Sequence, residues 1–69
     1  MDQDTLNLSI RRFLKQVGIQ SHQELEQWLA DAEQQGKLQG APVAVEVVLS
    51  VPSLGVEHRI SGKLDIDVP

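Results

Sequence analysis

The amino-acid sequence predicts an α+β domain in which two N-terminal helices pack on one face of a C-terminal antiparallel β-hairpin. The spacing of apolar residues changes near Gly40, from the 3.6-residue period of a helix to the two-residue period of a strand. The chain has 69 residues, of which 41% are hydrophobic and 23% charged, which is typical of one small globular domain. We therefore expect a single domain over residues 1–69, with a helical half at about 4–36 and a hairpin half at about 43–68.

The first predicted helix extends from about Asp4 or Thr5 to Val17, because apolar residues recur at helical spacing on one face. These residues are Leu6, Ile10, Phe13, Leu14 and Val17. Gly18 follows at the position where a glycine in the left-handed conformation commonly ends a helix. We therefore expect the first helix to end at Gly18.

A second helix is predicted from Ser21, because Ser21 and Glu24 have the spacing of a capping box, in which each side chain binds a free backbone amide at the helix start. The apolar face of this helix contains Leu25, Trp28, Leu29 and Ala32. Gly36, followed by Lys37, indicates its end. Only residues 18–20 separate the two helices, so we expect a tight corner or an antiparallel helical hairpin there.

Two strands follow. Odd positions are apolar from Val43 to Val51, and even positions are apolar from Val56 to Val68. Turn-forming residues lie between the strands at 52–55. Pairing Val51 with Val56 places both apolar sets on one side of the hairpin, with His58 among them.

The second strand is longer than its mate, and its end is a candidate interaction surface. The predicted register pairs Val43 with Leu64, so residues 65–68 have no partner strand in this chain. A second copy could pair there and extend the sheet to four strands, which predicts a homodimer that uses Leu64, Ile66 and Val68. The alternative is that the aspartates at 65 and 67 protect this edge from pairing, because such pairing would bring like charges together.

A second candidate surface is the outer face of the first helix, formed by Leu8, Arg11, Arg12 and Lys15. An alternative function uses these cations in a winged-helix-like module that binds nucleic acid, with the hairpin as the wing. The net charge of −4 and four carboxylates in the second helix disfavour nucleic acid. Those carboxylates are Glu24, Glu26, Asp31 and Glu33.

No residue pattern indicates catalysis. The chain has two histidines and no cysteine, and it contains no metal-ligand spacing, nucleophile motif or phosphate-binding loop. We therefore expect no catalytic, cofactor-binding or metal-binding residues. The absence of cysteine and of a long apolar run favours a cytoplasmic protein that does not bind membranes.

The sequence resembles a family of short bacterial proteins of unknown function. The resemblance rests on N-L-S-I-R-R-F-L-K-Q-V-G over residues 7–18 and on L-G-V-E-H-R over residues 54–59. The chain differs from the family pattern at Leu8, where methionine is expected, and at Trp28. The resemblance implies a bacterial cytoplasmic protein and supplies no site residues. Our interpretation is a small non-catalytic interaction or accessory module, with no specific function determined by the sequence.

Overall fold

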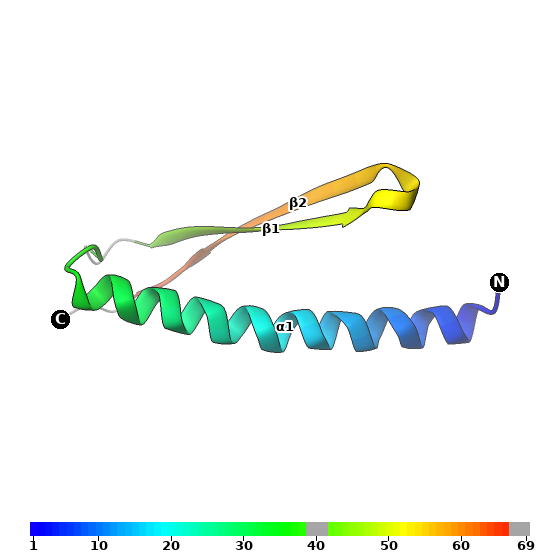
Figure 1. The fold of residues 1–69 in the computed structure, drawn as a ribbon, viewed down its shortest axis with the longest axis horizontal. Coiled ribbons are helices and arrows are strands. Elements are labelled where there is room, and N and C mark those ends of the chain that lie inside the picture. Colours follow the sequence, from blue (N-terminus) through cyan, green and yellow to red (C-terminus); the bar gives the residue numbers. More distant parts are fainter. Residues whose placement is uncertain (39–41, 67–69) are drawn as a thin grey trace. The chain divides into compact units, whose positions relative to one another are not determined.

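The computed structural model describes residues 1–38 and 42–66, and it contains one long helix followed by a two-stranded antiparallel hairpin (Figure 1). Helix α1 extends over Gln3–Gln34, strand β1 over Val43–Val51 and strand β2 over Val56–Leu64, with a 3₁₀ turn at Pro52–Leu54 between the strands. The α+β class is therefore confirmed. The chain consists of two compact units, Met1–Lys37 with α1 and Leu38–Pro69 with the hairpin.

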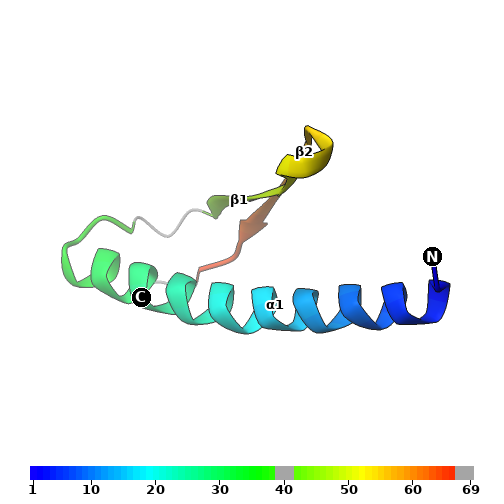
Figure 2. The same cartoon turned by 45° about the vertical axis from the view of Figure 1, so that its right-hand side comes forward.

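The prediction of two helices joined by a corner is wrong. Helix α1 continues without interruption through residues 18–20, as Figure 2 also shows. Gly18 is helical, and Ser21 lies inside the helix rather than at its start. A glycine in a helix interior costs about 1 kcal/mol relative to alanine. A break there would leave up to four amides and four carbonyls without helical partners on its two sides, which is the larger cost.

The N-terminus of α1 is capped by Asp2, so the helix begins slightly earlier than predicted. The Asp2 carboxylate accepts a hydrogen bond from the backbone amide of Asp4 at 3.1 Å and another from the Thr5 hydroxyl. These bonds satisfy a free amide of the first turn and place a negative charge at the positive end of the helix. The Thr5 hydroxyl and, second, the Asp4 amide hold the pKa of Asp2 below its ordinary value.

Helix α1 ends at Gln34, and Gly36, the residue predicted to stop it, follows the C-cap residue Gln35. Gly36 has a φ of 70°, a left-handed conformation that glycine adopts without strain. Its amide donates to the Glu33 carbonyl at 3.1 Å, and the Lys37 amide donates to the Ala32 carbonyl at 2.9 Å. This pair of bonds is the Schellman motif, which satisfies carbonyls that the last helical turn leaves free.

The predicted hairpin register is confirmed. Val51 pairs with Val56 at the turn, and the pairing continues without a bulge to Val43 and Leu64. Gly55 closes the turn with a φ of 65°. Strand β2 ends at Leu64, whereas the sequence predicted a strand as far as Val68. Residues 65 and 66 lie beyond the strand, and Val68 lies outside the described residues.

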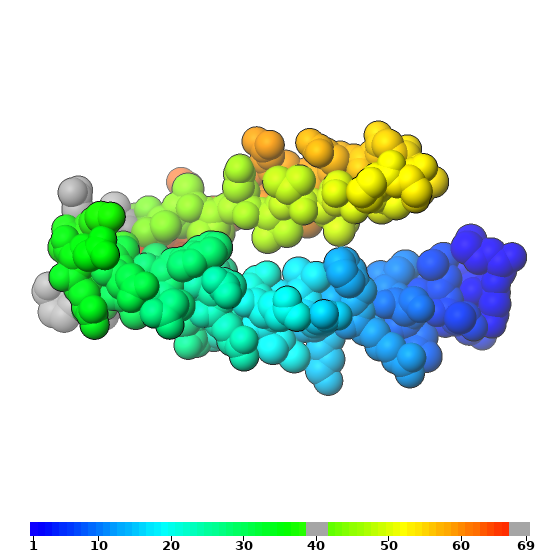
Figure 3. All heavy atoms as spheres, in the orientation of Figure 1, coloured from blue at the N-terminus to red at the C-terminus, as the bar shows by residue number. Residues whose placement is uncertain are grey.

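The expected buried core is not found, because no residue in the described ranges is buried. His58 lies opposite Leu49, on the predicted side of the hairpin, but it is exposed. On α1, side chains in the blue and cyan part of the space-filling view project from the helix surface (Figure 3). Packing of the helical half on the hairpin stays a prediction.

Candidate interaction surface

Helix α1 has an apolar face that extends along most of its length and is interrupted at Glu24, which points in the same direction as Leu6. Because the helix does not break at Gly18, the apolar residues that we assigned to two helices fall on one side, over roughly 160° of arc at about 100° per residue. We call this face the α1 stripe; its members are Leu6, Ile10, Phe13, Leu14, Val17, Leu25, Trp28, Leu29 and Ala32. Ser21 lies on the same face, four residues after Val17 and four before Leu25. This unbroken helical spacing across residues 17–25 could have indicated a single helix.

The α1 stripe is widely exposed. Ile10 is 45% exposed, Phe13 52% and Trp28 61%. Several other members are half-buried: Leu6, Val17, Leu25, Leu29 and Ala32. Aromatic side chains contribute large apolar areas when they are covered, and contiguous apolar surface of this kind marks protein–protein contacts. The α1 stripe is therefore the larger candidate surface on this unit.

Of the predicted surface, Leu8, Arg12 and Lys15 lie on the opposite face of α1 and Arg11 lies at the edge of the stripe; all four residues are exposed. Ile19, which is 52% exposed, lies on this same face three turns beyond Leu8. The sequence interpretation missed Ile19 because it placed this residue in a corner. A helical period extended past Gly18 would have identified it.

Charge is divided between the two halves of α1. Residues 3–17 contain three basic residues and one carboxylate, which gives a net charge of +2. Residues 18–34 contain four carboxylates and no lysine or arginine, which gives −4. The carboxylates in this second half are Glu24, Glu26, Asp31 and Glu33. The N-terminal half of α1 is therefore net positive and its C-terminal half net negative.

A histidine and a carboxylate, His22 and Glu26, are in contact on α1. His22 Nε2 contacts Glu26 Oε1 one turn away, and the two side chains are 71% and 72% exposed. Within residues 1–38 and 42–66, no group of three or more His, Cys, Asp or Glu side chains could hold a metal ion. This pair is therefore best described as a surface contact within the helix.

The hairpin has its own exposed apolar face. Val47 is 45% exposed and its partner Ile60 is 53% exposed. On the other face, Arg59 Nη1 lies 3.9 Å from Glu46 Oε1. Of the predicted edge surface, Leu64 ends β2 and Ile66 follows it, and both are half-buried. Both residues therefore lie at the end of β2. Val68 is outside the described residues.

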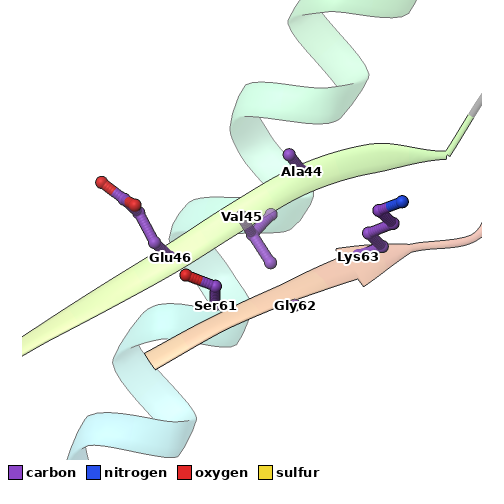
Figure 4. Close-up of a pocket in the computed structure, with 6 residues that line it drawn as sticks. All are labelled: Ala44, Val45, Glu46, Ser61, Gly62 and Lys63. Atoms are coloured by element: carbon purple, nitrogen blue, oxygen red, sulfur yellow. The ribbon is translucent and has the colours of Figure 1, made fainter. Parts of the chain in front are cut away.

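A shallow hollow lies on the hairpin where the two strands meet near their open end (Figure 4). It is lined by Ala44, Val45, Glu46, Ser61, Gly62 and Lys63. It forms in part because Gly62 pairs with Val45 and has no side chain to place beside it. All its walls come from β1 and β2, so the hollow is a feature of the sheet surface.

The described residues thus define a small α+β protein built of one helix and one hairpin, with exposed apolar faces on both. The chain belongs to DUF6494, a family of unknown function, whose model matches residues 1–67. Membership of a family without known function is therefore confirmed, and it assigns no site residues. Neither the curated proteins nor the solved structures include a significant match. No helix in the described part of the chain is long and apolar enough to span a membrane.

Proposed function

We propose that this chain is a small non-catalytic interaction module of the cytoplasm that associates with itself through exposed apolar side chains. One observation carries the proposal: none of the residues that the structure describes is buried, while large apolar side chains on α1 and on the hairpin are exposed by 40% or more. These side chains include Phe13, Trp28, Val47 and Ile60. Self-association would cover some of them.

The energetics favour a partner. Complete burial of a large apolar side chain contributes about 1.5–3 kcal/mol relative to exposure. A core in a domain below about 70–80 residues rarely supplies more than about 3–5 kcal/mol of stability. Because the exposed side chains are already about half covered, each would contribute about half of that amount, and covering four of them would add about 3–6 kcal/mol, comparable to a whole core of this size. Self-association is a common way for small proteins to gain this contribution.

The non-catalytic character is supported by the positions of the titratable groups. General acid–base chemistry needs groups held in a site that excludes water and shifts their pKa values. The one His–carboxylate contact among the described residues, between His22 and Glu26, is largely exposed. The cytoplasmic setting rests on the cysteine-free sequence.

The winged-helix-like alternative loses its geometrical basis. That architecture needs two helices at a corner, one of which enters the DNA groove. Helix α1 has no corner, and its basic residues Arg11, Arg12 and Lys15 are followed on the same face by Glu26. A DNA groove that contacted this face along its length would meet both signs of charge.

Sedimentation equilibrium over a range of concentrations tests the proposal. We expect a mass near twice the 7.6 kDa of one chain, together with a thermal midpoint that rises with concentration. Monomeric mass at every concentration, with a midpoint independent of concentration, would contradict self-association.

A further inference from the structure

We propose that two copies of the chain associate through their α1 stripes as antiparallel helices, with the two-fold axis near Ile19. This inference rests on the proposed function, because it names the surface and the geometry of the same self-association. The partner that covers the α1 stripe is a second copy of this chain.

The first observation concerns the extent of the stripe. It begins at Leu6 and ends at Ala32 within a helix that spans Gln3–Gln34, so its midpoint is residue 19. A two-fold axis at this position lets the two antiparallel stripes overlap over their whole length. An axis moved by a turn or more toward either end would leave apolar side chains at the opposite end of each helix uncovered.

The pairs that meet across this axis are complementary in size. Residues at equal distances on either side of position 19 would lie at the same level in the two copies. Four such pairs are Leu6 with Ala32, Ile10 with Trp28, Phe13 with Leu25, and Val17 with Ser21, while the two remaining stripe members, Leu14 and Leu29, lie level with Glu24 and Ser9. A parallel pair would instead place Trp28 against Trp28 and Ser21 against Ser21, which crowds one level and puts two hydroxyls in the centre of an apolar contact.

The second observation is the division of charge along α1. An antiparallel pair places the +2 half of each helix beside the −4 half of the other, whereas a parallel pair aligns like charges. Packed helices lie about 8–10 Å apart, comparable to the Debye length at physiological salt, so the difference acts mainly through charges at the edges of the contact, and Arg12 and Lys15 on the far face contribute less. The helix dipoles favour the same antiparallel orientation.

The opposite face of α1 is the competing surface. Leu8 and Ile19 lie there, with Arg12 and Glu26 on either side of position 19. Opposite charges would lie closer together in a contact on this face, but it has fewer apolar side chains, which are separated by long charged ones. The apolar content therefore favours the stripe, and a matched pair of variants separates the two faces.

The matched variants are Ile10→Glu on the stripe and Leu8→Glu on the opposite face. The two side chains are 45% and 48% exposed and lie within one turn of each other, so the substitutions are alike in all but the face that they alter. In sedimentation equilibrium we expect Ile10→Glu to give the mass of one chain and Leu8→Glu to keep that of two. The reverse result would overturn the inference and assign the contact to the opposite face.

Distances between spin labels test the orientation without altering the stripe. Single cysteines replace Ser9, Gln20 or Gln34, all exposed and outside the stripe, in a chain that has no other cysteine. With 1.5 Å per residue, the antiparallel pair separates the two labels along the axis by about 3 Å at position 20, about 30 Å at position 9 and about 45 Å at position 34. Equal short distances at all three positions would overturn the inference but keep self-association. The absence of any dipolar coupling, with monomeric mass, would overturn the proposed function itself.

Discussion

Gly36 and Gly18 have opposite backbone roles in the helical unit. Gly36 has a φ of 70° and ends α1, whereas Gly18 has an ordinary helical conformation in its middle. A Cβ atom added at either glycine would have no neighbouring atom within 4 Å, so backbone conformation alone separates the two positions.

We therefore expect opposite effects from the same substitution. Gly18→Ala should stabilise the helix by about 0.5–1 kcal/mol, since alanine removes the entropy cost of glycine in a helix interior. Gly36→Ala should destabilise it by about 1–2 kcal/mol, because alanine is strained in the left-handed conformation. Thermal unfolding followed by circular dichroism measures both. A loss of stability in Gly18→Ala would indicate that the helix breaks at this residue in solution.

The hairpin offers a similar contrast between Gly62 and Gly55. At Gly62 a Cβ atom would lie 4.0 Å from Val45 Cγ2, an ordinary van der Waals contact, and the φ is not positive. Gly62→Ala should therefore stabilise the hairpin by about 0.4–1 kcal/mol. Gly55→Ala is the control, since a φ of 65° makes alanine unfavourable there. Urea unfolding of the two variants should show opposite signs; the same sign for both would contradict the described turn.

The cap at Asp2 predicts a pH dependence. Because the pKa of Asp2 is held below its ordinary value of 3.8, its contribution to helix stability is present above 3.8 and is lost as the pH falls through the lower value. Thr5→Val removes the first cause of the shift and should move the Asp2 pKa upward, while Thr5→Ser should retain it. A carboxyl titration by NMR measures the pKa in each variant. An Asp2 pKa that is unchanged in Thr5→Val would show that the hydroxyl bond does not form.

Salt should weaken the dimer. In the antiparallel pair, opposite charges on neighbouring helices attract, and added salt screens that attraction. We expect the dissociation constant to rise several-fold between low and high salt at neutral pH, measured by sedimentation equilibrium. A dissociation constant that falls steadily with salt would be the behaviour of a parallel pair with like charges aligned.

The hairpin could be predicted from sequence because two independent constraints agree on its register. The apolar parity of each strand and the turn at 52–55 both pair Val51 with Val56, and a slip of one residue would place apolar side chains on the polar face. Strand β2 was predicted too long because the alternation of apolar and polar residues continues beyond Leu64. Strand β1 begins at Val43, which pairs with Leu64, so residues after Leu64 have no partner in β1.

The single helix could not be predicted because the local signals at its centre point the other way. Gly18 resembles a helix end, and Ser21 with Glu24 resembles a helix start, yet each signal has a free energy of about 1 kcal/mol. Continued helical hydrogen bonding outweighs them. The α1 stripe was missed for the same reason, since its two halves were assigned to separate helices.

The position of cross-links between two copies tests the antiparallel contact most directly. Leu6→Cys and Ala32→Cys each introduce one thiol at opposite ends of the α1 stripe, in a chain with no cysteine of its own. After oxidation we expect disulfide-linked dimers in a mixture of the two variants and no such dimers in either variant alone, because only residues 6 and 32 meet across an axis near Ile19. Efficient cross-linking of each variant with itself, and little between the two, would contradict the account.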